Sequence, residues 1–193
     1  MRSTLTRATA AALAVAATVA VAGAADAKPQ RHAHRAQAAP VSTLELTPSS
    51  AALAACMPDA RLTVTVKETV DDVGFDSFKI KARHLPPNRP YTVFLLEQAG
   101  APFGAAEYIG DFTTNRFGNT RNEFKTIVSE AFASTIVDGQ RVRVDLNRVG
   151  VWFADPADDE FCLPGSNATP FDGDDEAGVQ AFNSANADPL PAP

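Results

Sequence analysis

The sequence predicts an all-β protein, an antiparallel, immunoglobulin-like β-sandwich of seven or eight short strands. Several segments alternate apolar and polar residues with the period of two that a strand with one buried face requires. Turn signals separate these segments every 8–15 residues, and no segment has the pattern of a long helix. A barrel with a similar number of strands is the alternative that the same pattern allows.

The segment 91–96 is expected to be the most deeply buried strand. It follows a corner at 85–90 in which three prolines exclude a helix and limit ladder hydrogen bonds. Its sequence, Tyr-Thr-Val-Phe-Leu-Leu, is apolar on both faces and rich in aromatic and β-branched residues. We therefore expect a central strand that is covered on both sides.

The other strands alternate, so each is expected to have one face in water. Residues 61–67 show this most clearly, with Leu62, Val64 and Val66 on one face. The dipeptide Asp138–Gly139 is the strongest hairpin signal in the chain. Short helical turns are predicted within 48–56 and 129–132, and strands are predicted at 41–47, 61–67, 77–83, 106–113, 122–128, 141–147 and 149–153.

The chain is expected to divide into four parts. Residues 1–27 have two arginines, a short apolar run and the sequence Ala25-Asp26-Ala27, which together predict a cleaved secretory signal peptide. Residues 28–43 are basic and lack periodicity, which predicts a disordered linker. Residues 44–163 are expected to form the sandwich, and 164–193 an acidic, partly ordered C-terminal segment. We expect the mature protein to be secreted or held in the cell envelope, without a membrane span.

The charge of the chain is unevenly distributed. Residues 44–153 hold 12 Lys and Arg against 13 Asp and Glu, whereas residues 154–193 hold nine acids and no Lys or Arg. A nearly neutral body argues against a nucleic-acid partner, because phosphate binding requires a basic face. The acidic end of the chain is of the kind that solvates a protein, meets a basic partner or collects cations.

The two cysteines, Cys56 and Cys162, predict one disulfide in an exported chain. Such a bond would close a loop of 106 residues (162 − 56). In the chain-entropy model it stabilises the fold by about 4–5 kcal/mol. Two buried free thiols are the alternative.

The segment 82–119 carries a recurring pattern of turn and core residues. It contains Leu-Pro-Pro, then Tyr-x-Val-x-Leu, then Ile-Gly-x-Phe-x-Thr, and finally Phe-Gly-Asn. This pattern resembles the central hairpin region of small exported bacterial β-sandwich domains, including the outer domain of anti-sigma-K-type regulators. The resemblance covers about forty of the 193 residues and implies a sandwich without an enzymatic site.

The sequence offers no set of catalytic residues, and we expect neither an enzyme nor a cofactor. Motifs for a serine nucleophile or a phosphate loop are absent from it. His84 is the single histidine of the predicted domain, and a turn role is expected for it rather than general base catalysis. The pair His32 and His34 lies in the predicted linker. Asn167 begins a glycosylation sequon.

Two acidic clusters are the candidate site for a cation. Carboxylates that gather in a loop are ligands for Ca²⁺, which takes six to eight oxygens. The second cluster begins like a helix–loop–helix calcium loop but has Ala177 where that loop needs glycine. The candidate ligands, for Ca²⁺ only, are Asp155, Asp158, Asp159, Glu160, Asp172, Asp174 and Glu176.

From these observations we expect an exported, non-catalytic β-sandwich that acts as a binding or structural module for an unknown envelope or extracellular ligand. Two alternatives use the same acidic region. One is an exported hydrolase that depends on carboxylates, and the other is a calcium-dependent adhesive module.

Overall fold

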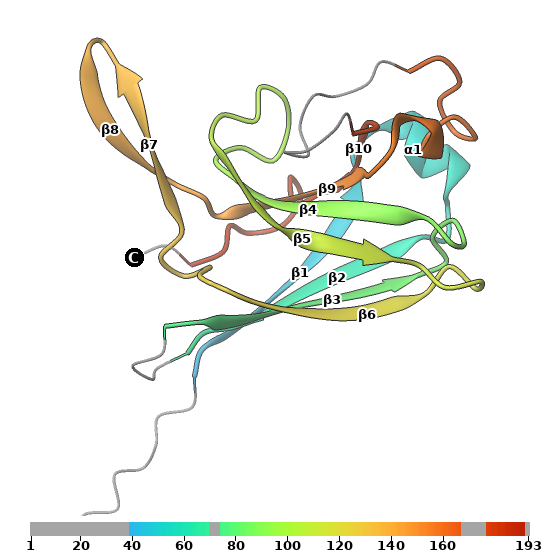
Figure 1. Cartoon of the computed structure of the whole chain (residues 1–193), viewed down its shortest axis with the longest axis horizontal. Coiled ribbons are helices and arrows are strands. Elements are labelled where there is room, and N and C mark those ends of the chain that lie inside the picture. Colours follow the sequence, from blue (N-terminus) through green and yellow to red (C-terminus); the bar gives the residue numbers. More distant parts are fainter. Residues whose placement is uncertain (1–38, 70–73, 167–176, 192–193) are drawn as a thin grey trace, which may run out of the picture. The chain divides into compact units, whose positions relative to one another are not determined.

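The computed structural model describes residues 39–69, 74–166 and 177–191, and this part of the chain is an all-β, antiparallel protein (Figure 1). It has one short α-helix and one 3₁₀ turn. The bounds are β1 Val41–Pro48, α1 Ala51–Cys56, β2 Arg61–Lys67, β3 Asp76–Arg83, β4 Pro90–Leu96, β5 Ala106–Thr113, β6 Thr120–Thr126, β7 Phe132–Val137, β8 Gln140–Asp145, β9 Arg148–Phe153, η1 Pro156–Asp158 and β10 Gln180–Asn183.

Eight strands form one continuous sheet in the order β5-β4-β9-β10-β1-β2-β3-β6. The two end strands approach each other through side chains, because a Cβ atom added at Gly110 in β5 would lie 2.5 Å from the Phe124 ring in β6. The sheet is therefore nearly closed and resembles a barrel. The predicted all-β antiparallel class is confirmed, whereas the immunoglobulin-like sandwich is not.

Strand β4 is buried on both faces, as the sequence predicts. Tyr91, Val93 and Leu95 lie in the main core, which they share with β1, β2, β3 and β9. Phe94 and Leu96 point the other way and pack with Trp152 in a second, smaller cluster. This second cluster explains why the segment has no polar face.

The ordered domain extends beyond the predicted limits of 44 and 163. Strand β1 begins at Val41, and β10 lies between β9 and β1 within the sheet. The sequence of β10, Gln-Ala-Phe-Asn, is too short to show a strand period, although its residues are largely buried. The predicted signal peptide and residues 28–38 of the predicted linker lie outside the described residues. Residues 41–43, which the sequence assigned to the disordered linker, belong to β1. Within the described part, no helix has the length and apolar character that crossing a membrane requires.

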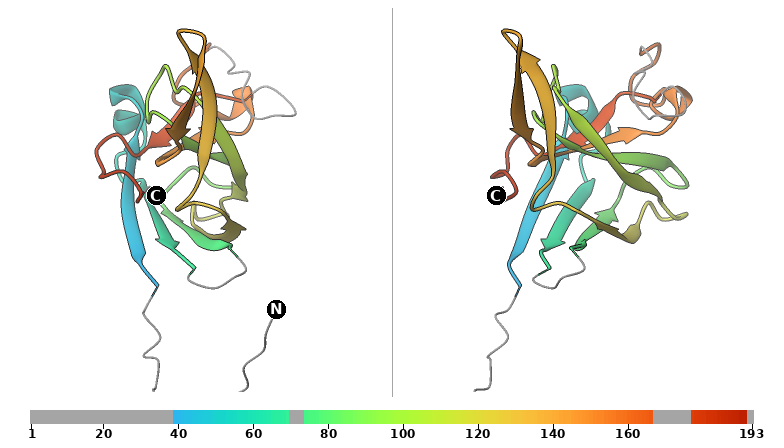
Figure 2. Two further views of the ribbon diagram at one scale, coloured as in Figure 1. Left: turned by 90° about the vertical axis from the view of Figure 1, so that its left-hand side faces the viewer. Right: turned by 60° about the vertical axis from the view of Figure 1, so that its left-hand side comes forward.

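Strands β7 and β8 form a separate hairpin that projects away from the large sheet (Figure 1, Figure 2). Its turn is the predicted Asp138–Gly139, and both residues have positive φ, as the favoured two-residue hairpin turns require. Strand β7 starts at Phe132, where the sequence suggested the end of a helical turn. Strand β7 is exposed along most of its length, so its apolar residues do not alternate between a buried and an exposed face. The sequence therefore lacks the period of two by which a strand is predicted.

Asp76 anchors β3 to the segment that leads into this hairpin. Its carboxylate accepts hydrogen bonds from the backbone N–H groups of Thr69, Val128 and Ser129 and from the Ser129 hydroxyl. Burial alone would raise the Asp76 pKa, but the hydrogen bonds from these donors outweigh it and hold the pKa below its usual value.

We predict that Asp76→Asn lowers stability and weakens its dependence on pH. The ionised form is favoured in the folded state, so its contribution is complete above the unfolded pKa of about 3.9 and is lost as pH falls through the folded pKa. The loss near pH 7 is expected to be about 1–3 kcal/mol, the usual value when a charged hydrogen-bond partner is removed. Urea unfolding at pH 7 and at pH 3 measures both effects.

Asp188→Asn is the matched control, because Asp188 is exposed and has no hydrogen bond among the described residues. Stability of Asp76→Asn equal to that of this control at pH 7 would contradict the anchoring role.

Candidate binding site at the proline corner

The proline corner forms one wall of an open pocket of about 740 Å³. The corner, 85–90, and His84 before it connect β3 to β4, and the opposite wall is formed by the segment after α1 and by the loop after η1. The polar and aromatic side chains that line the pocket are Asp59, Arg61, Arg83, His84, Arg89 and Phe161.

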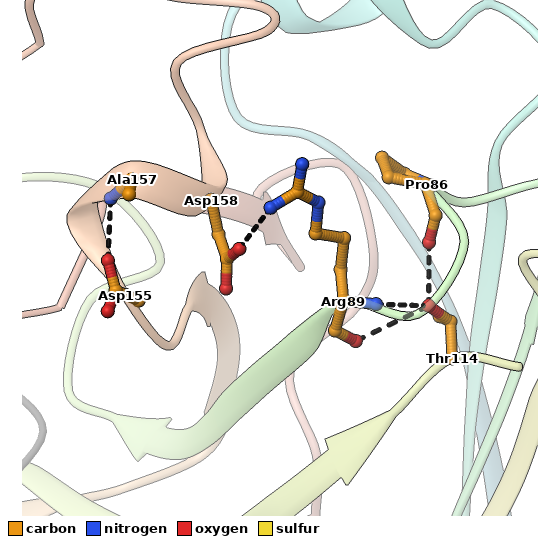
Figure 3. Close-up of polar contacts among 6 residues, drawn as sticks. All are labelled: Pro86, Arg89, Thr114, Asp155, Ala157 and Asp158. Atoms are coloured by element: carbon orange, nitrogen blue, oxygen red, sulfur yellow. Dashed lines mark hydrogen bonds and ion pairs between the residues drawn. The ribbon is translucent and has the colours of Figure 1, made fainter.

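One buried threonine holds the corner in place. The Thr114 hydroxyl donates to the carbonyl oxygen of Pro86 at 2.6 Å and accepts the backbone N–H of Arg89 at 3.0 Å (Figure 3). The backbone N–H of Thr114 also donates to the carbonyl oxygen of Arg89 at 3.0 Å. Because prolines cannot donate, the side chain that directly follows β5 supplies the hydrogen bonds that the corner cannot make within itself.

The turn 114–119 packs against the other end of the corner. The Leu85 N–H donates to the Gly118 carbonyl oxygen at 3.0 Å, and the His84 N–H donates to Asn119 Oδ1 at 3.3 Å. His84 has a φ of 55°, so it takes the left-handed conformation of a turn residue. The turn role that the sequence predicted for His84 is thus confirmed, and the turn presents its side chain in the pocket lining.

The predicted disulfide is confirmed and joins two parts of the pocket wall. Cys56 ends α1, Cys162 follows η1, and a disulfide bond connects them. Residues next to both cysteines, Met57 and Phe161, line the pocket. The bond therefore fixes the wall opposite the proline corner.

Positive charge gathers on one side of the pocket. Arg61 on β2 and Arg83 on β3 are directly opposed cross-strand neighbours, an arrangement that costs stability for like charges. Arg61 Nη1 donates to the carbonyl oxygens of Pro58 and Ala60. Arg83 has neither an ion pair nor a side-chain hydrogen bond with any described residue. A negatively charged group between these two guanidinium groups would relieve their repulsion.

Arg89 is the third arginine, and its position is set by two contacts. It forms an ion pair with Asp158 in η1 (Figure 3). Its guanidinium carbon also lies 5.9 Å from the centroid of the Phe161 ring, which is 47% exposed. Arg89 is therefore preorganised, since a side chain that is already fixed loses less freedom when a ligand binds.

Tyr91 lies behind this ion pair in the core, between Phe112 and Phe153. Its hydroxyl is buried and has no hydrogen-bond partner in the described part of the chain. Burial raises the Tyr91 pKa, and the negative charge of Asp158 raises it further. The phenol is therefore neutral at physiological pH and does not serve as a base.

The carboxylates of the first acidic cluster have local structural roles. Asp155 caps η1 by accepting the Ala157 N–H, and Asp158 pairs with Arg89. Asp159 is fully buried and accepts from the Ser166 hydroxyl and the Val179 N–H, which ties the loop to the segment before β10. Glu160 accepts the Gly165 N–H. Each carboxylate thus has its own partner.

No three acidic, histidine or cysteine side chains come together as a metal site among residues 39–69, 74–166 and 177–191. The second cluster, with Asp172, Asp174 and Glu176, lies outside the described residues, as do His32, His34 and the sequon at Asn167. The sequence did not indicate the arginine pocket, because Arg61, Arg83 and Arg89 are spread over three elements. Only the strand register brings Arg61 beside Arg83.

Comparisons with known proteins identify no relative. No family model matches the chain, and no curated protein or solved structure matches it either. The resemblance of segment 82–119 to the outer domains of anti-sigma-K-type regulators therefore stays a prediction, and the function has to be inferred from the site itself.

We predict that Gly118→Ala destabilises the protein far more than Gly139→Ala. Both glycines have positive φ, 69° and 77°, so each substitution carries backbone strain of about 1–2 kcal/mol. A Cβ atom at Gly118 would also lie 1.8 Å from the Leu85 carbonyl oxygen, whereas nothing lies within 4 Å of a Cβ atom at Gly139. The difference in the free energy of unfolding between the two variants measures the cost of the clash between the turn and the corner. Equal losses for the two variants would show that the turn does not support the corner.

Proposed function

We propose that the protein is an exported, non-catalytic binding module of the extracellular space or cell envelope, and that it binds an anionic group in the pocket at the proline corner. The observation that carries this proposal is the directly opposed pair Arg61 and Arg83, with Arg89 lining the same pocket. Guanidinium groups are the side chains best suited to carboxylate, phosphate or sulfate ligands, because their paired N–H donors match the geometry of such anions.

Export is supported by the predicted signal peptide and by the disulfide. A disulfide that closes a separation of 106 residues suits an oxidising compartment. It also holds the pocket wall, and such bonds commonly stabilise exported domains in this way.

The composition of the pocket favours binding over catalysis. Its lining contributes His84 as an imidazole and Asp59 as a carboxylate, while Cys56 is held in the disulfide. Among the described lining residues none is a serine, a threonine or a free thiol, so His84 has no nucleophile to activate there. A pocket that has three arginines but no nucleophile beside a base can bind and orient an anion.

The two alternatives now depend on different residues. A hydrolase would need carboxylates that are free to act, and the four of the first cluster are engaged in hydrogen bonds or an ion pair. A calcium-dependent adhesive module would need Asp172, Asp174 and Glu176. A rise in Tm of several degrees with 2 mM Ca²⁺ relative to EDTA, which is lost in D172N/D174N, would support the calcium module. The anion-binding proposal predicts no calcium-dependent shift.

We predict that the protein binds small anions and that R61Q/R83Q weakens this binding. Isothermal titration calorimetry at low ionic strength, with sulfate, phosphate and citrate as separate probes, measures the affinity. Loss of charge-assisted hydrogen bonds worth about 1.5–3 kcal/mol lowers affinity by about 10- to 100-fold. Added salt should weaken binding by the wild type, because the partly exposed pocket is screened.

The matched control is R141Q/R143Q, which removes the same charge from the exposed β7–β8 hairpin. A separate check is thermal stability. R61Q/R83Q removes a like-charge pair but also the hydrogen bonds from Arg61 to Pro58 and Ala60, so the Tm should change little. Binding that weakens equally in both double variants, or that is absent from the wild type for all three anions, would overturn the proposal.

A further inference from the structure

The outward face of strands β1, β2, β3 and β6 is strongly basic, although the chain as a whole has a net charge of −6. Residues that alternate with the core positions point outward on this face. Seven of the outward residues are basic: Arg61, Lys67, Lys79, Lys81, Arg83, Arg121 and Lys125. Two are acidic, Glu45 and Glu123. We call this surface the basic face.

Like charges lie directly opposite each other at two places on the basic face. Arg83 is opposite Arg61, and Lys81 is opposite Arg121 in the next strand pair. Each such pair costs stability in the free protein. The cost falls when an anion lies between the two side chains, so the arrangement favours a ligand that carries several negative charges.

The basic face also carries a chain of connected hollows. The pocket at the proline corner shares Arg83 with a hollow of about 340 Å³, which includes Asn115 and Asn119. That hollow shares Lys81 and Arg121 with a third one of about 570 Å³ beside Thr63 and Thr65. The three hollows therefore form a row along β3 that begins at the proline corner, and we call this row the path.

The basic side chains on β3 recur at a constant spacing. Lys79, Lys81 and Arg83 are two residues apart, which places successive charges about 6.6–6.8 Å from each other along the strand. At the far end, Glu123 has a pKa lowered to about 2 by the hydrogen bond from Lys125, with contributions from Ser77 and Lys79. Lys79 and Lys125 are thus paired with Glu123, whereas Lys81, Arg83 and Arg121 have no ion pair with a described residue.

We infer that the ligand is a linear acidic polysaccharide that lies along β3, with one of its anionic groups in the pocket at the proline corner. This inference rests on the proposed function and extends it from a single anion to a polymer. The shared chemistry is a chain of sugar hydroxyl groups with repeated carboxylate, sulfate or phosphate groups. Threonine hydroxyls and asparagine amides along the path supply donors and acceptors for the sugar hydroxyls.

The side chains of the basic face favour this polymer over the other polyanions. Single-stranded nucleic acids bind surfaces on which aromatic rings stack against bases, and the outward positions of β1, β2, β3 and β6 carry no aromatic residue. An anionic membrane surface is bound most firmly when basic residues accompany apolar ones that enter the lipid. Threonine is the main neutral residue here, and Val41 is the one large apolar side chain among those outward positions.

The test compares polymers with their monomers in binding to the purified protein. Galacturonate and inorganic sulfate are the monomeric probes, and polygalacturonate and dextran sulfate are the corresponding polymers. Comparison of the two polymers shows whether the protein recognises carboxylate or sulfate groups. A duplex DNA and vesicles of phosphatidylglycerol are the other polyanions. We expect at least one polymer to bind at least tenfold more tightly per site than its monomer, the DNA or the vesicles.

The variant K79Q/K81Q removes two charges from the path and leaves the pocket arginines in place. It should weaken polymer binding about tenfold and make log K less dependent on log salt, because fewer counterions are released, while monomer binding is unchanged. The variant R141Q/R143Q, with the same change in charge, should bind the polymer like the wild type.

The outcomes separate the two proposals. Monomer binding without any gain for either polymer would overturn the polysaccharide inference and leave the anion pocket intact. Tighter binding of DNA or of vesicles, lost in K79Q/K81Q, would assign the basic face to that other class of partner. Absence of binding to every probe would overturn the proposed function as well.

Discussion

The Thr114 hydroxyl joins Pro86 to Arg89 and so closes a corner that its prolines leave short of hydrogen-bond donors. The position of the pocket depends on this contact, because the corner carries His84 and Arg89 and leads directly from β3 into β4. Gly118 lets the neighbouring turn approach Leu85, and the Cys56–Cys162 disulfide holds the opposite wall. A rigid frame of this kind lowers the entropy that a ligand would lose on binding.

The fold class and most strands followed from local patterns. Segments 61–67 and 77–83 alternate strictly, and each became a strand with the expected inward face. The predictions failed where local pattern is weak. Strand β10 has four residues and owes its place to β9 and β1 on either side, while β7 pairs only with β8 in an exposed hairpin. Eight strands can form two layers or one nearly closed sheet, depending on whether the two end strands meet. Here β5 meets β6 where Gly110 lies against Phe124, and the periodicity of the sequence does not reveal this contact.

The candidate site was less predictable than the fold. The acidic residues Asp155–Glu160 drew attention because they are close in sequence, but in the structure they cap a turn, pair with Arg89 and tie down a loop. The residues of the basic face are spaced along several strands, and acidic residues elsewhere offset their charge when the whole chain is counted. Register and alternation place them on one face. The net charge of a chain segment therefore did not reveal the basic face, whereas the charge on each face of the sheet does.

The central claim is that an anionic polymer contacts the basic face and the pocket together. Backbone ¹H–¹⁵N chemical shift mapping during titration with polygalacturonate and, separately, with dextran sulfate tests it most directly. We expect that, with one of these polymers, shift changes follow β3 from Lys79 to Arg83, continue to His84 and include the turn near Asn119, while the β7–β8 hairpin is unaffected. With both polymers, changes that cluster on the hairpin, or that spread evenly over the surface, would contradict it.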